Sequence, residues 1–156
     1  MAAAQLLQKS RRKDNPLGMK FKTISSEFFL PAAHVEAALA AIKAEQELVT
    51  RFPKVLECQT LGEVFGFMGW FAYANGRGDI VELGVSKPTY LRQDSEMLHA
   101  LAQFARNGSY FKCRLEDGTR WKWVIRDGKL MVRYPKDSKV SVIRISKAPQ
   151  AIDVHN

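Results

Sequence analysis

The chain has 156 residues, is 46% hydrophobic and carries a net charge of +8, which is enough length and apolar content for a domain with its own core. No apolar run approaches the length of a membrane-spanning helix, and residues 1–18 lack the continuous apolar stretch of a secretory signal. These features disfavour a membrane partner and predict a cytoplasmic protein, in which Cys58 and Cys113 need not form a disulfide.

The positive charge is concentrated at the two ends of the chain. Residues 1–22 carry a net +5, residues 23–108 carry −3 and residues 109–156 carry +6. Such a localised charge favours nucleic acid or an acidic protein surface as the partner.

The first 18 residues are predicted to form a basic flexible arm. Lys9 to Lys13 form its basic cluster, in which Arg11, Arg12 and Lys13 are the candidate binding residues, and Asn15-Pro16-Leu17-Gly18 interrupts regular structure. The cluster could contact a phosphate backbone or simply be solvated, and Met19 could itself be a translation start. We expect a single domain over residues 19–147 and a tail over 148–156.

The first half of this domain combines a strand with helices. Residues 21–29 alternate as a strand does, and residues 31–48 have apolar side chains at helical spacing. Residues 49–59 are interpreted as a connection. Thr60 and Glu63 have the spacing of a capping box, which predicts a short helix as far as Met68.

A hairpin and another helix follow. Residues 70–73 and 80–85 flank the glycine-rich turn 75–79, which is typical of a β-hairpin. Residues 95–106 carry an apolar stripe at helical spacing, and Asn107-Gly108 supplies a stop signal. His99 is expected on the solvated side of this helix.

Residues 109–134, SYFKCRLEDGTRWKWVIRDGKLMVRY, alternate apolar and basic side chains in three runs. Asp127-Gly128 joins the last two runs and is typical of a two-residue hairpin turn, because both central residues need positive φ. The loop Glu116–Gly118 suits a three-residue turn that ends in a left-handed glycine. The pattern predicts an antiparallel meander, to which residues 140–146 could add a fourth strand.

These turns fix a register in which Lys112 faces Lys122, Lys122 faces Arg133 and Trp121 faces Tyr134. A slip by one residue would exchange the two faces of the sheet, so burial of the apolar face should hold the register. The apolar face consists of Phe111, Cys113, Leu115, Trp121, Trp123, Ile125, Leu130, Val132 and Tyr134. The other face carries Lys112, Arg114, Arg120, Lys122, Arg126, Lys129 and Arg133, with an apolar row of Tyr110, Val124 and Met131.

Like charges directly opposite one another destabilise a sheet by about 0.2–1 kcal/mol per pair. The row of Lys112, Lys122 and Arg133 would therefore be relieved by an anionic partner. The alternative is that this face is simply solvated, and that its Lys and Arg residues keep the protein soluble and prevent the sheet edges from pairing with other strands. The two interpretations weigh about equally for this segment, and the overall charge distribution favours the anionic partner.

Common catalytic motifs are missing from the sequence. It has no H-E-x-x-H, C-x-x-C, G-x-S-x-G or Walker motif, and its three histidines are scattered. Asp79 and Glu82 are three residues apart on an expected strand and would point to opposite faces, so they would not share a metal ion. We therefore expect neither catalysis nor a cofactor or metal site.

The second half of the chain resembles a group of small uncharacterised bacterial α+β proteins. The likeness rests on the pattern GSY…EDG…W.W…DGK…YP after a helix, here between Gly108 and Pro135, and covers about residues 20–135. Because it rests on turn and core residues, it implies the fold and transfers no functional residue. This chain has a more basic sheet and adds the arm before Met19.

The sequence thus predicts an α+β fold with an antiparallel sheet built from an N-terminal strand, one hairpin and a C-terminal meander of three or four strands. Two or three helices should cover its aromatic face. The leading functional hypothesis is a module that binds RNA or single-stranded DNA through the basic sheet residues, the arm and Tyr110 as a stacking ring. The second hypothesis is an adaptor or inhibitor, for example a phage or mobile-element accessory, that binds an acidic or nucleic-acid-handling protein. The third is a subunit of a structural assembly that uses the row Tyr110–Val124–Met131.

Overall fold

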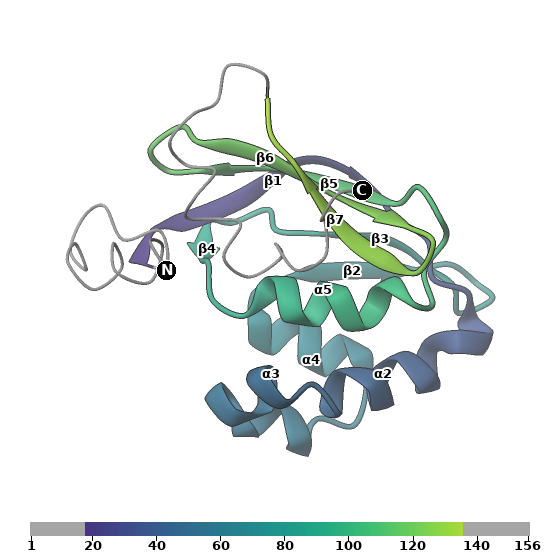
Figure 1. The fold of residues 1–156 in the computed structure, drawn as a ribbon. Helices are drawn as coiled ribbons and strands as arrows, with labels where there is room; N and C mark the ends of the chain where they lie inside the picture. The colour runs from purple at the N-terminus through teal and green to yellow at the C-terminus, as the bar shows by residue number, and fades with distance from the viewer. Residues whose placement is uncertain (1–17, 136–156) are drawn as a thin grey trace.

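The structure, a computed structural model, describes residues 18–135. The basic cluster of the predicted arm, the possible strand 140–146 and the tail lie outside the described residues. Within them, a five-stranded antiparallel sheet has the order β4-β1-β5-β6-β7, and a second sheet pairs β2 with β3 (Figure 1). The strands are β1 (Lys20–Glu27), β2 (Phe71–Ala74), β3 (Ile80–Gly84), β4 (Thr89–Tyr90), β5 (Tyr110–Leu115), β6 (Arg120–Arg126) and β7 (Lys129–Arg133).

The helices gather on one side of the five-stranded sheet (Figure 1). They are the 3₁₀ helices η2 (Ala32–His34) and η3 (Pro53–Glu57) and the α-helices α2 (Val35–Lys43), α3 (Gln46–Arg51), α4 (Leu61–Met68) and α5 (Asp94–Ala102). This arrangement confirms the predicted α+β class. The described residues contain four α-helices where two or three were expected.

The extra helix arises because the predicted helix 31–48 is broken. Its chain leaves the helical path at Glu45, whose backbone is extended, before α3 begins. The buried residues Ile42 and Leu48 are six positions apart, which places them about 120° from each other around a continuous helix. The break lets both reach the core. Residues 49–59, predicted as a connection, contain the end of α3 and η3.

The prediction that a helix extends to Arg106 is also wrong, because α5 ends at Ala102. The backbone N–H of Arg106 donates to the carbonyl of Phe29 at 2.8 Å, and its guanidinium lies 4.4 Å from the Phe29 ring. This long-range pairing with Phe29, two residues beyond the end of β1, takes residue 106 out of the helix. The capping box at Thr60 is confirmed, since its hydroxyl accepts the N–H of Glu63 at 3.1 Å.

The predicted register of the meander is confirmed. Lys112 pairs with Lys122 and Lys122 with Arg133, while both residues of the Asp127-Gly128 turn have positive φ. The expected pair Trp121–Tyr134 lies beyond the last residue of β7.

The aromatic face of the meander forms the core against the helices. Trp121, Trp123 and Phe111 are each at most 2% exposed, and Phe21 from β1 packs against both tryptophans with ring centroids 5.9 and 6.2 Å apart. Burial of so much aromatic surface on one side leaves the opposite side of the sheet to carry the charges.

The β2–β3 hairpin is held against the edge of β1. The Thr23 N–H donates to the Val85 carbonyl at 3.0 Å, and the Thr23 hydroxyl accepts the Val85 N–H at 3.0 Å. This close approach needs a glycine, because a Cβ on Gly84 would lie 2.8 Å from the Thr23 hydroxyl and 3.2 Å from the Phe71 ring.

We expect Gly84→Ala to destabilise the fold by about 1–3 kcal/mol, because the added methyl group must push β3 away from Thr23. Gly66→Ala is the matched control, since Gly66 lies inside α4 with nothing within 4 Å of an added Cβ. It should stabilise the protein by about 0.5–1 kcal/mol. Urea denaturation measures both, and equal effects of the two variants would contradict the packing described for β3.

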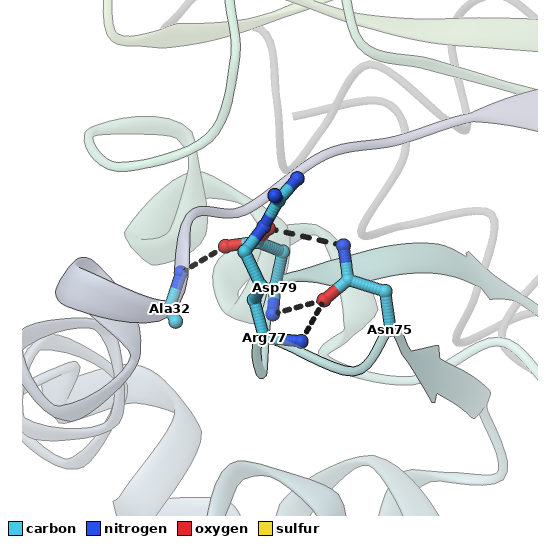
Figure 2. A network of polar contacts seen from close by, with 4 residues as sticks. All are labelled: Ala32, Asn75, Arg77 and Asp79. Atoms are coloured by element: carbon cyan, nitrogen blue, oxygen red, sulfur yellow. Dashed lines mark hydrogen bonds and ion pairs between the residues drawn. The ribbon is translucent and has the colours of Figure 1, made fainter.

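Asp79 connects this hairpin to the first helical turn (Figure 2). One oxygen of its carboxylate accepts the Ala32 N–H at 2.8 Å, and the other accepts the Asn75 amide at 3.0 Å and lies 3.5 Å from Arg77 Nε. These interactions, the Ala32 hydrogen bond foremost, hold the pKa of Asp79 below its usual value. These contacts give Asp79 a structural role, which is to fix the hairpin to the first helical turn.

Asp79→Ala should lower the melting temperature at neutral pH, whereas Arg77→Ala should change it little, because the Arg77 side chain is 83% exposed. A lowered pKa means that the stability contributed by Asp79 is present above its unfolded pKa, about 3.9, and is lost as the pH falls through the folded value. The gap between wild type and Asp79→Ala should accordingly narrow in acid. Thermal melts between pH 7 and pH 3 test this, and a gap that widens in acid would contradict it.

Candidate functional site

The side of the five-stranded sheet that faces away from the helices carries nine cations, and we call it the basic face. Seven are the predicted meander residues Lys112, Arg114, Arg120, Lys122, Arg126, Lys129 and Arg133, which are exposed or half-buried. The other two are Lys20 and Lys22 of β1, which the register with β5 places on the same face. The structure therefore brings together the sheet residues predicted from the sequence and extends them by one strand.

The cations form two rows across the strands. In one row Lys22 pairs with Arg114, which pairs with Arg120. Lys112, Lys122 and Arg133 form the second row. Strands lie about 4.8 Å apart and alternate residues about 7 Å apart along a strand, so the backbone positions of these six cationic residues span a patch of roughly 7 by 14 Å.

These charges have no carboxylate partner among residues 18–135. The single ion pair in that part of the chain joins Arg77 to Asp79 on the β2–β3 hairpin. Glu27 and Glu116 lie at opposite ends of the basic face, and neither forms an ion pair with another described residue. The like-charge repulsion expected from the sequence is therefore present, without compensation, in the described structure.

Two tyrosines accompany the cations. Lys122 Nζ lies 4.6 Å from the centroid of the Tyr110 ring, and Lys20 Nζ lies 5.2 Å from that of Tyr90. Tyr110 is half-buried, so the open stacking ring expected at this position is partly covered by Lys122. Tyr90 pairs with Lys20 at the edge of the sheet and is 50% exposed, which makes it the more accessible ring.

The apolar row of the basic face offers little surface for contact. Val124 is only 6% exposed, and Tyr110 and Met131 on either side are half-buried.

A hollow of about 290 Å³ opens on the basic face. Its cationic lining is Lys112, Arg120, Lys122 and Arg133, and its apolar lining includes Ile24, Tyr134 and Pro135. Ile24 is there because of a β-bulge in β1. Thr23 pairs with Cys113 and Ser25 with Lys112, so Ile24 has no partner on β5 and its side chain is 46% exposed.

The described residues show no grouping suited to metal binding, because no three His, Cys, Asp or Glu side chains come together in residues 18–135. Cys58 and Cys113 are buried free thiols, and burial raises the pKa of Cys113 well above its usual value, which keeps it protonated. His99 is half-buried with its Nδ1 enclosed, so its expected solvated position is wrong.

Asp94 is a fully buried carboxyl at the start of α5. It accepts the Trp70 indole N–H at 2.8 Å and the Arg92 backbone N–H at 2.8 Å. Burial raises the pKa of Asp94, against the lowering effect of these hydrogen bonds. It lies in the core behind the sheet and takes no part in the basic face.

Sequence reasoning missed Lys20, Lys22, Tyr90 and Ile24. The alternation around the buried Phe21 does place both lysines on the other face of their strand. The strand that pairs with it, β5, lies some 90 residues away in the sequence, and this pairing was not predicted. Arg11, Arg12 and Lys13 lie outside the described residues.

Comparisons with protein-family models, curated protein sequences and solved structures find no match to this chain. None of the helices within residues 18–135 has the length and apolar character needed to cross a membrane.

Proposed function

We propose that this protein binds nucleic acid, RNA or single-stranded DNA, through the basic face without catalysing a reaction. The observation that carries the proposal is the pair of cation rows, Lys22–Arg114–Arg120 and Lys112–Lys122–Arg133, without an ion pair to a described carboxylate. Phosphate groups placed over the rows would supply the counter-charge, and contacts to phosphates dominate the affinity of nucleic-acid-binding proteins.

A single strand suits this surface better than a duplex. Reading the major groove requires a helix or β-ribbon that protrudes, whereas the helices of the described residues lie behind the sheet (Figure 1). A sheet that combines cations with the accessible ring of Tyr90 matches the way that single strands are bound, by backbone contacts and stacking.

An acidic protein surface is the alternative partner, and it would occupy the same face. Its support is the exposed apolar side chain of Ile24 beside the cations, because protein interfaces combine apolar contacts with charge complementarity. A structural assembly through the row Tyr110–Val124–Met131 is less favoured, since Val124 is buried.

The two partners are distinguished by purifying the full chain from its native host with and without nuclease treatment. We expect nucleic acid to co-purify with the protein, and to be lost both after nuclease treatment and from the Arg120→Glu/Lys122→Glu variant. A stoichiometric protein band that survives nuclease treatment would support the adaptor instead.

A further inference from the structure

We infer that the hollow on the basic face receives one unpaired nucleotide, its phosphate on the cations and its base against Ile24. This inference rests on the proposed function and specifies which form of nucleic acid the face selects. The hollow of about 290 Å³ is close to the lower size limit of pockets that hold small organic ligands.

The lining matches the two halves of a nucleotide. Lys112 and Lys122 face each other across β5 and β6 and can both approach one phosphate, and Arg133 continues the row on β7. None of the residues within 18–135 that line the hollow is acidic. An anionic group is therefore favoured in the middle of the hollow.

The apolar part of the ligand has a defined place at the β1 side. The bulge between Thr23 and Ser25 brings the exposed side chain of Ile24 next to Lys112, whose partner on β1 is Ser25. An isolated phosphate or a polyanion without bases would leave this side chain in water. A base in contact with Ile24 would bury it.

A base can make this contact only when it is outside a base-paired stack. In a duplex the bases lie inside the helix, and extruding one costs pairing and stacking energy. The hollow therefore favours a single strand over a duplex of equal charge, whereas the cation rows alone would not.

Ile24→Ala tests the inference with two probes, a short oligouridylate and inorganic polyphosphate of similar charge. Loss of the apolar contact with the base should weaken oligouridylate binding about fivefold and leave polyphosphate binding unchanged. Circular dichroism confirms that the variant folds, which the exposure of Ile24 favours. Leu56→Ala on η3, also at an exposed apolar residue, is the control and should change neither affinity.

An equal loss for both probes, or no loss for either, would overturn the inference and leave the proposed function standing. The inference would also be overturned if the wild-type protein bound single-stranded oligouridylate and an oligouridylate–oligoadenylate duplex with equal affinity. If wild type binds none of these polyanions, the proposed function and the inference both fail.

Discussion

Arg120→Glu combined with Lys122→Glu is expected to weaken binding of a single-stranded oligonucleotide by roughly 25-fold or more at 0.1 M salt. The estimate follows from losing two phosphate contacts, each worth about 0.7 in the slope of log K against log salt concentration for a single strand. Charge reversal adds repulsion to this loss. Fluorescence anisotropy with a labelled oligonucleotide measures the change.

The same variant should remain folded and should not lose stability. The glutamate that replaces Lys122 would lie between Lys112 and Arg133, and the glutamate that replaces Arg120 would face Arg114, so three like-charge pairs become opposite-charge pairs. Each such pair contributes about 0.2–1 kcal/mol, against about 0.5–1 kcal/mol for the lost contact of Lys122 with Tyr110. We therefore expect a free energy of unfolding equal to that of wild type or up to about 2 kcal/mol higher.

Arg51→Glu with Lys54→Glu is the matched control. Both residues are exposed in the helical layer, away from the basic face, and the variant has the same net charge as the double change on β6. Its affinity for the oligonucleotide should fall far less. An equal fall in both variants would show that net charge, rather than this surface, controls binding.

Asp94→Ala is expected to cause the largest loss of stability, roughly 2–6 kcal/mol at pH 5. The substitution leaves the Trp70 indole N–H and the Arg92 backbone N–H without their acceptor in the core, and each unsatisfied buried donor costs about 1–3 kcal/mol. Asp94→Asn keeps the size of the side chain and one acceptor oxygen, so it should lose about half as much.

The stability that Asp94 contributes should also depend on pH in a defined direction. Because burial raises the pKa of Asp94 in the folded state, the folded protein binds this proton more tightly than the unfolded chain does. The resulting stability is fully present below the unfolded pKa, about 3.9, and is lost as the pH rises through the folded value. The advantage of wild type over Asp94→Asn should therefore shrink between pH 4 and pH 8. Urea denaturation across this range tests it, and an advantage that grows with pH would contradict a raised pKa.

The meander was predictable because its determinants are local. Asp127-Gly128 favours a turn whose two central residues have positive φ, as they do in the structure. The alternation of side chains on either side of the turn then assigns each of them to one face of the sheet. The register of the structure confirms this assignment from Phe111 to Arg133. Seven of the nine cations of the basic face follow from this one segment.

The remaining features depend on contacts between distant parts of the chain. The Ala-rich segment 31–48 predicts a single helix from its composition, but burial of both Ile42 and Leu48 breaks it at Glu45. The lysines of β1 join the site only through pairing with β5, and the bulge that exposes Ile24 depends on the same pairing. Periodicity within one segment carries no information about the break in the helix or about the pairing of β1 with β5.

The most direct test of the account is the affinity of the full chain for a single-stranded oligonucleotide measured across a series of salt concentrations. The six cations of the two rows predict a linear fall of log K with log salt concentration, with a slope of roughly −4. The Arg120→Glu/Lys122→Glu variant should show a slope that is less steep by at least about 1.4. An affinity that does not change with salt, or a slope that is the same in both proteins, would contradict the assignment of the basic face as the binding surface.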